Sequence, residues 1–384
     1  MPQAILPDTI SLHQTHKYSG LDHLRALAIT LVIFFHFQGF GHPKWIEGQV
    51  TSFGWSGVDL FFVLSGFLIA GQLFGTIAKG KAISLKEFFA KRFFRIIPPY
   101  LVMLILYTAF PILRERDQFA PLWRYLTFTL NFGFDLKKYG NFSHAWSLCI
   151  EEQFYLVLPL IILLFTHFKK GRWSAYLIVG LFLSGFGIRL FIWDHYIVPQ
   201  QSLDDFSIWY KHIYYPTYTR LDGLLTGVGI AGLYTFYPDI KNKISNYGNL
   251  ILFLGIALLV AAFFVCREHS GFSATMFGFP LAALSYGLIV AAVVLPSCIL
   301  YRLKSKFTAH LATLSYSIYL IHKLMIHITQ MLGEKAGMDK NSNLMFLLSI
   351  VSSVIGALLL RYLVEKPCLK IRDKVLLRWR EGED

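Results

Sequence analysis

The stretch "LDHLRALAITLVIFFHFQGF", residues 21–40, is apolar enough to lie in a lipid bilayer, yet it contains Arg25 and His36. The eleven residues that separate them would turn an α-helix by three full turns plus about 20°, and would rise about 16 Å. Both side chains therefore fall on one face of the helix, with His36 about half a bilayer deeper than Arg25. An ionisable side chain inside a bilayer is costly, so its presence indicates a functional site.

Each of the two residues also has a simpler explanation when it is taken alone. Arg25 could anchor the helix at the membrane surface while its aliphatic stem lies along the apolar edge. His36 could be a neutral histidine that forms a hydrogen bond with a neighbouring helix. Their shared face favours a common cavity over two unrelated polar residues.

The composition indicates a membrane protein. Of 384 residues, 55% are hydrophobic and 15% are charged, and the mean hydropathy is +0.51, well above that of soluble domains of this length. The sequence predicts an all-α fold, a polytopic membrane helical bundle of about ten transmembrane helices in a single membrane domain. The predicted spans are 24–40, 57–77, 94–113, 146–166, 174–193, 216–237, 248–266, 273–297, 310–332 and 343–364.

The distribution of Lys and Arg predicts the orientation of these spans. With a cytoplasmic N-terminus, the inner connectors hold roughly twice as many Lys and Arg as the outer ones, which is the bias expected for cytoplasmic segments. We expect residues 1–20 to form a cytoplasmic N-terminal segment, 21–366 the membrane domain, and 367–384 a basic cytoplasmic tail. The formal net charge of +13 fits contact with anionic lipid headgroups, and we expect no nucleic-acid partner.

Further polar side chains lie beside apolar runs, where a shared cavity could include them. Ser147 and Glu151 are four residues apart on one helix face, and His322 lies in "LSYSIYLIHKLMIH", where packing is as good an explanation as chemistry. Arg220 could instead pair with a carboxylate as a structural ion pair. The candidates are Asp59, Ser147, Glu151, Glu152, Arg220 and Asp222.

Several of these motifs together resemble the acyltransferase-3 family of integral membrane O-acyltransferases. The hallmark of that family is a basic residue and a histidine separated by ten residues in the first span, which Arg25 and His36 match. The resemblance covers nearly the whole chain. It continues in order through "GVDLFFVLSGFLI", "FFAKRFFRIIPPY", "WSLCIEEQFYLVLPL", "RLDGLLTG", "LSYSIYLIH" and "YLVEKP".

The resemblance implies acyl transfer from a cytoplasmic acyl-CoA, with acetyl-CoA as the default, to a hydroxyl of a sugar-containing acceptor such as a cell-surface polysaccharide. It also implies a multi-pass protein of the bacterial inner membrane. A sugar hydroxyl is a poor nucleophile near neutral pH, and histidine suits the role of its general base. We expect His36 to be this base or a transient acyl-imidazole carrier, and Asp59, Glu151 or Glu152 to orient its ring.

The cytoplasmic end of the bundle is where the polyanionic donor would bind. Arg25, Arg92 and Arg95 are predicted to contact the CoA phosphates, because guanidinium groups suit phosphate oxygens. Basic residues at an inner membrane edge are also common signals of topology, which is the alternative for Arg92 and Arg95.

The outer end is where the acceptor would bind. The predicted contacts are Trp146, Ser147, Arg220 and Asp222, together with aromatic rings of the outer connectors. Many of these rings could instead belong to the aromatic belt that membrane proteins carry at the interface.

Two other functions use the same residues. A transporter of a lipid-linked sugar or similar solute could place them along a translocation pathway, and a membrane sensor could bind the acyl donor without releasing its thiol. The ordered set of motifs favours the enzyme. The four cysteines lack metal-ligand spacing, so no metal is predicted.

Overall fold

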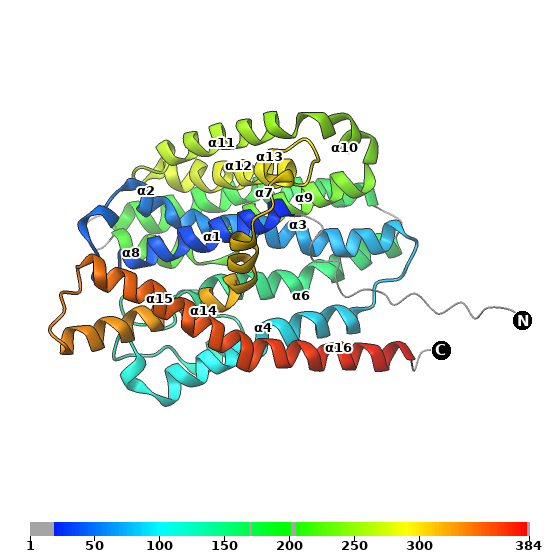
Figure 1. The fold of residues 1–384 in the computed structure, drawn as a ribbon. Coiled ribbons are helices and arrows are strands. Elements are labelled where there is room, and N and C mark those ends of the chain that lie inside the picture. The colour runs from blue at the N-terminus through cyan, green and yellow to red at the C-terminus, as the bar shows by residue number, and fades with distance from the viewer. Residues whose placement is uncertain (1–18, 169–170, 201–204, 382–384) are drawn as a thin grey trace, which may run out of the picture.

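The computed structural model describes residues 19–168, 171–200 and 205–381. Over these residues the protein is a bundle of helices that run side by side, and this part of the chain contains no β-strand (Figure 1). Of the predicted segments, 1–20 lies almost entirely outside the described residues. The tail from 367 onward forms most of helix α16 (Lys366–Glu381).

The long helices follow the predicted windows. They are α1 (Ser19–Phe37), α3 (Ser56–Ala78), α4 (Leu85–Ala109), α6 (Ala145–His167), α7 (Gly171–Ile192), α9 (Asp222–Phe236), α11 (Gly248–Val265), α12 (Phe279–Val293), α14 (Lys306–Lys335) and α15 (Asn343–Leu360). Shorter helices lie between them: α2 (Gln49–Ser52), α5 (Leu122–Leu126), α8 (Asp205–Trp209), α10 (Pro238–Ile244) and α13 (Ile299–Arg302). The π-helices are η5 (Trp193–Ile197), η7 (Tyr210–Tyr214), η10 (Ala274–Gly278) and η11 (Arg361–Glu365).

Eight helices of the described residues are long and apolar enough to cross a membrane, so the predicted count of about ten is not confirmed. The windows 94–113 and 216–237 correspond to α4 and α9, which are not among the eight. The first half of α4 is strongly charged, and α9 has only 15 residues, about 22 Å of helix. That is shorter than the roughly 30 Å core of a bilayer.

The helices α3 and α9 approach each other closely because glycines line their contact. A Cβ atom added at Gly66 would lie 2.1 Å from the carbonyl oxygen of Leu224, and one added at Gly227 would lie 2.2 Å from that of Val63. Small residues permit such close packing in membrane helices. This packing brings the outer end of α3, which carries Asp59, against the segment that leads into α9.

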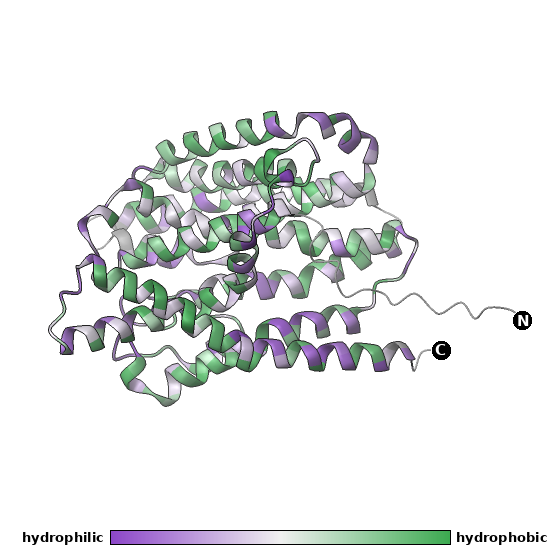
Figure 2. Cartoon of the chain, viewed as in Figure 1, coloured by the Kyte–Doolittle hydropathy of each residue, from purple (hydrophilic) through white to green (hydrophobic). Residues whose placement is uncertain are grey.

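The first helix occupies a central position because it packs against both α3 and α14. These contacts place the Arg25 and His36 face of α1 inside the bundle, whereas large apolar side chains on α7 and α11, such as Leu183 and Phe253, are exposed. Figure 2 shows hydrophobic residues over most of the long helices, and hydrophilic residues gathered on α16, the start of α4 and α10. The surface of the bundle is therefore suited to lipid along its length and to water at its ends.

The C-terminal helix lies beside the first part of α4 (Figure 1). The ammonium group of Lys86 lies 4.1 Å from the ring centroid of Trp379, a distance at which a cation and an indole ring attract each other. The two helices form a basic projection at the end of the bundle where α3 ends and α4 begins.

Candidate active site

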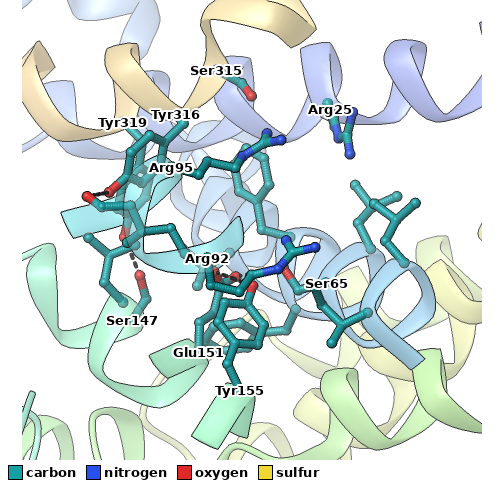
Figure 3. Close-up of a pocket in the computed structure, with 18 of the residues that line it drawn as sticks. Arg25, Ser65, Arg92, Arg95, Ser147, Glu151, Tyr155, Ser315, Tyr316 and Tyr319 are labelled. Carbon is teal, nitrogen blue, oxygen red and sulfur yellow. Dashed lines mark hydrogen bonds between the residues drawn. The ribbon is translucent and has the colours of Figure 1, made fainter. Parts of the chain in front are cut away.

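A cavity of about 290 Å³ lies between α1, α3, α4, α6 and α14 (Figure 3). We call it the inner cavity. Its polar lining residues are Arg25, Ser65, Gln72, Arg92, Arg95, Ser147, Glu151, Tyr155, Ser315, Tyr316 and Tyr319. The three arginines predicted to bind the donor therefore meet at one cavity, although they come from two separate helices.

The arginines of the inner cavity keep hydrogen-bonding capacity for a ligand. Arg92 donates from Nη2 to Oε1 of Gln72 at 3.0 Å, while its buried Nε has no partner. Nη1 of Arg25 lies 3.7 Å from Oδ1 of Asp22, which is too long for a hydrogen bond. Because Glu151 is the single carboxylate among the lining residues, the cavity suits an anion.

Hydroxyl groups and Glu151 form the polar wall of the inner cavity. Oε1 of Glu151 accepts a hydrogen bond from Ser65 at 2.9 Å, and Oε2 accepts one from the Tyr155 hydroxyl at 3.0 Å. The Tyr319 hydroxyl lies 2.5 Å from Oγ of Ser147 and donates to the carbonyl oxygen of residue 144 at 2.8 Å. Glu151 is therefore held at the wall of the inner cavity, and neither of these hydrogen bonds joins it to His36.

A second cavity, of about 640 Å³, contains His36. We call it the outer cavity. Its aromatic residues are Phe35, Phe40, Trp55, Trp146, Tyr210, Tyr214 and Tyr215, and its polar residues include His36, Gln38, Glu115, Arg116, His144, His269, Lys323 and His327. Val58 lines both cavities. Arg25 and His36 thus lie on one side of α1 as predicted, but they face two cavities that share a wall rather than one common cavity.

Three histidines meet at the wall of the outer cavity. The ring centroids of His36 and His322 are 4.9 Å apart, those of His144 and His322 are 5.1 Å apart, and those of His36 and His144 are 6.0 Å apart. Nδ1 of His36 lies 2.9 Å from the carbonyl oxygen of Val32. Because a carbonyl only accepts hydrogen bonds, Nδ1 carries the proton and Nε2 is left with a free lone pair. His36 therefore has the tautomer that a general base needs.

The surroundings of this cluster keep His144 uncharged. Its Nε2 lies 3.0 Å from the carbonyl oxygen of Leu320. Burial, together with His322 and Lys323, lowers the pKa of His144 well below its usual range. The ammonium of Lys323 pairs with Glu115 at 2.6 Å and donates to Oγ of Ser143 at 3.0 Å. His144 is therefore neutral near pH 7.

Among the described residues, no group of three or more His, Cys, Asp or Glu is arranged to hold a metal ion.

Three of the predicted site residues form buried ion pairs instead. Nη2 of Arg220 lies 2.9 Å from both carboxylate oxygens of Asp59, and Nη1 of Arg189 lies 2.8 Å from Asp222. None of these four residues lines the inner or the outer cavity. They pair because a charge buried this deeply requires a partner of opposite sign. The structure thus gives Asp59 no contact with His36. It also separates Arg220 and Asp222 from the cavity surface.

The remaining predictions divide between the two cavities. Of the residues predicted to contact the acceptor, Trp146 lines the outer cavity, whereas Ser147 lines the inner one. Glu152 follows Glu151 on α6 and does not line either cavity. His144 and Lys323 were not among the predicted site residues, although both adjoin recognised motifs: His144 precedes "WSLCIEEQFYLVLPL" by two residues, and Lys323 follows "LSYSIYLIH" directly.

The fold and the two cavities define a polytopic membrane protein with two polar cavities inside its helical bundle. The chain matches the family model described as acyltransferase domain over residues 18–362, and it belongs to this family. The motif resemblance seen in the sequence is thereby confirmed.

Curated relatives of this chain are named as O-acetyltransferases. The chain is 30% identical over 320 residues to O-acetyltransferase OatA of Staphylococcus aureus strain NCTC 8325 / PS 47, covering 79% of this chain and 49% of that protein. It is 29% identical over 330 residues to a putative O-acetyltransferase of Staphylococcus aureus strain MSSA476, covering 80% and 50%. The chain spans about half the length of the curated relatives it matches. No solved structure matches it.

The ion pair of Asp59 with Arg220 can be separated experimentally from a direct role in chemistry. Asp59→Leu leaves the Arg220 guanidinium buried without its partner, which should destabilise the protein by about 3–5 kcal/mol. The double variant Asp59→Leu with Arg220→Met removes both charges and should regain most of the thermal stability measured in detergent. A single variant that melts like the wild type but has no activity would show that Asp59 acts in the reaction instead.

Proposed function

We propose that this protein is an integral membrane O-acyltransferase that moves an acyl group, by default acetyl, from cytoplasmic acyl-CoA to a hydroxyl of a sugar-containing acceptor. The observation that carries the proposal is the pair of cavities that share a wall at Val58, one lined by arginines and the other by a histidine in the tautomer of a base. Membership of the acyltransferase family supports it.

The inner cavity is the proposed donor site. Arg25, Arg92 and Arg95 would bind the phosphates of CoA through charge-assisted hydrogen bonds. The hydroxyls of Tyr155 and Ser65 would lie along the path of the pantetheine arm. This assignment requires the end of the bundle that carries α16 to face the cytoplasm, in agreement with the excess of Lys and Arg there. In a bacterium, the membrane would be the cytoplasmic one.

The outer cavity is the proposed acceptor site. The rings of Trp55, Trp146 and Tyr214 provide flat apolar surfaces for a sugar ring, while the polar groups at the wall can bind its hydroxyls. The resident partners of the protein would be membrane lipids, acyl-CoA and this acceptor, without nucleic acid.

His36 would carry the chemical step. Nε2 takes the proton of the acceptor hydroxyl as its oxygen attacks the thioester carbonyl carbon. The new C–O bond forms, the C–S bond breaks, and the CoA thiolate receives the proton back from Nε2. In the alternative route, Nε2 attacks the thioester carbon first, the C–S bond breaks and CoA leaves as the thiolate. The acceptor oxygen then takes the acyl group from the transient acyl-imidazole, which frees Nε2, and the hydroxyl proton passes to the thiolate. In both routes Glu151 and Glu152 act from the donor side, near Arg92, rather than on the histidine.

Replacing His36 tests the proposal directly. We expect His36→Ala to reach the membrane and fold, but to lose transfer of label from acetyl-CoA to envelope glycans together with release of the CoA thiol. Removal of a general base typically lowers the rate by 10²–10⁴-fold. His310→Ala is the matched control, because His310 is an exposed histidine of α14 that lines neither cavity. Normal acylation by His36→Ala would overturn the mechanism.

Replacing Arg25 tests the donor site. Arg25→Ala should weaken acetyl-CoA binding about tenfold or more, the effect of losing one charge-assisted hydrogen bond to phosphate. Binding can be followed by calorimetry in nanodiscs. Lys243→Ala removes the same charge from exposed α10 at the same end of the bundle (Figure 1), and it should bind the donor like the wild type. An unchanged affinity in Arg25→Ala would remove Arg25 from the donor site.

A further inference from the structure

The ring of His36 is held by a second histidine rather than by a carboxylate. Nδ1 of His36 lies 3.2 Å from Nε2 of His322 and 2.9 Å from the carbonyl oxygen of Val32. No Asp or Glu of the described residues forms a hydrogen bond or ion pair with His36. In a serine-type triad, a carboxylate fixes the tautomer of the base and stabilises its cation. Here the carbonyl oxygen of Val32 already accepts from Nδ1, so it is the cation that needs a further partner.

His322 is fully buried, and its own tautomer is fixed. Its Nδ1 lies 3.0 Å from the carbonyl oxygen of Ile318 and 2.9 Å from that of Tyr319. Since both partners only accept, Nδ1 of His322 carries its proton and Nε2 is an acceptor. The Nε2 lone pair is then available for the Nδ1–H group of His36.

The other polar groups near His36 form no hydrogen bond with its ring, although the buried Nδ1 of His144 has no partner of its own. Nε2 of His144 is bound to the carbonyl oxygen of Leu320, and its ring lies farther from His36 than that of His322 does. The ammonium of Lys323 is paired with Glu115. The imidazolium that forms on His36 during the reaction therefore has neutral His322 as its hydrogen-bond partner. The nearby positive charge of Lys323 is compensated by Glu115.

We propose that His322 is a positioning residue that takes the place of the triad carboxylate. By accepting a hydrogen bond from Nδ1–H of His36 beside the carbonyl of Val32, it helps to keep Nε2 free and stabilises the cation that forms when Nε2 takes the proton of the acceptor. That proton returns through Nε2 to the leaving thiolate, so His322 gains and loses no atom in the cycle. This role rests on the proposed function of His36.

Two replacements of His322 separate this role from simple packing. His322→Leu fills the space without an acceptor, and kcat for acetyl transfer should fall at least tenfold while KM for acetyl-CoA changes less than about twofold. His322→Gln restores an acceptor oxygen and should regain most of kcat. His310→Leu, on the exposed part of the same helix, should behave like the wild type. Equal losses of kcat in the Leu and Gln variants would overturn the proposal.

A measurement that does not depend on activity completes the test. ¹⁵N NMR of histidine-labelled protein in nanodiscs should find Nδ1 of His36 protonated, Nε2 bare, and a scalar coupling between Nδ1 of His36 and Nε2 of His322. A proton on Nε2 of His36, or the absence of the coupling, would contradict the arrangement even if the enzyme is active. If the tautomer and coupling are present but the wild type transfers no acyl group, the proposed function fails and the histidine pairing stands.

Discussion

Polar groups within a bilayer must be satisfied by the protein itself, and this constraint organises the bundle. Two buried ion pairs join separate elements: Asp59 of α3 pairs with Arg220 in the segment before α9, and Asp222 of α9 pairs with Arg189 of α7. A third, Glu115 with Lys323, joins the segment after α4 to α14. Breaking such a pair leaves a buried charge, so these contacts fix how the helices sit. The polar residues that face the cavities are then the ones available to a ligand, and they include Arg25 and His36.

The resulting arrangement suggests how a charged donor and a sugar acceptor could react across a membrane without either one crossing it. The inner cavity takes anions at its arginines, and the outer cavity offers aromatic rings and a histidine base. Val58 belongs to the linings of both cavities. In the proposed reaction only the small acyl group would pass from one cavity to the other at this point. In this account the large polar parts of both substrates stay on their own sides, which distinguishes the protein from a transporter.

The sequence was sufficient for features that depend on neighbouring residues. Hydropathy located the helices, and the spacing of Arg25 and His36 predicted their shared face because helical geometry is local. The predicted count of about ten spans is not confirmed, since α4 begins with a charged stretch ahead of its apolar window and α9 is short. The partners of the candidate site residues could not be predicted without tertiary information. Asp59 pairs with Arg220, 161 positions away, and His36 contacts His322, 286 positions away. No local pattern specifies which of several carboxylates and histidines will meet.

The central claim is that donor and acceptor bind from opposite faces and exchange only the acyl group. It can be tested in proteoliposomes of uniform orientation, with labelled acetyl-CoA supplied only on the side of α16 and the acceptor glycan only on the opposite side. We predict that label accumulates on the acceptor while the CoA thiol is released on the donor side, and that exchanging the two compartments abolishes transfer. Transfer that occurs only when donor and acceptor share one compartment would contradict this account.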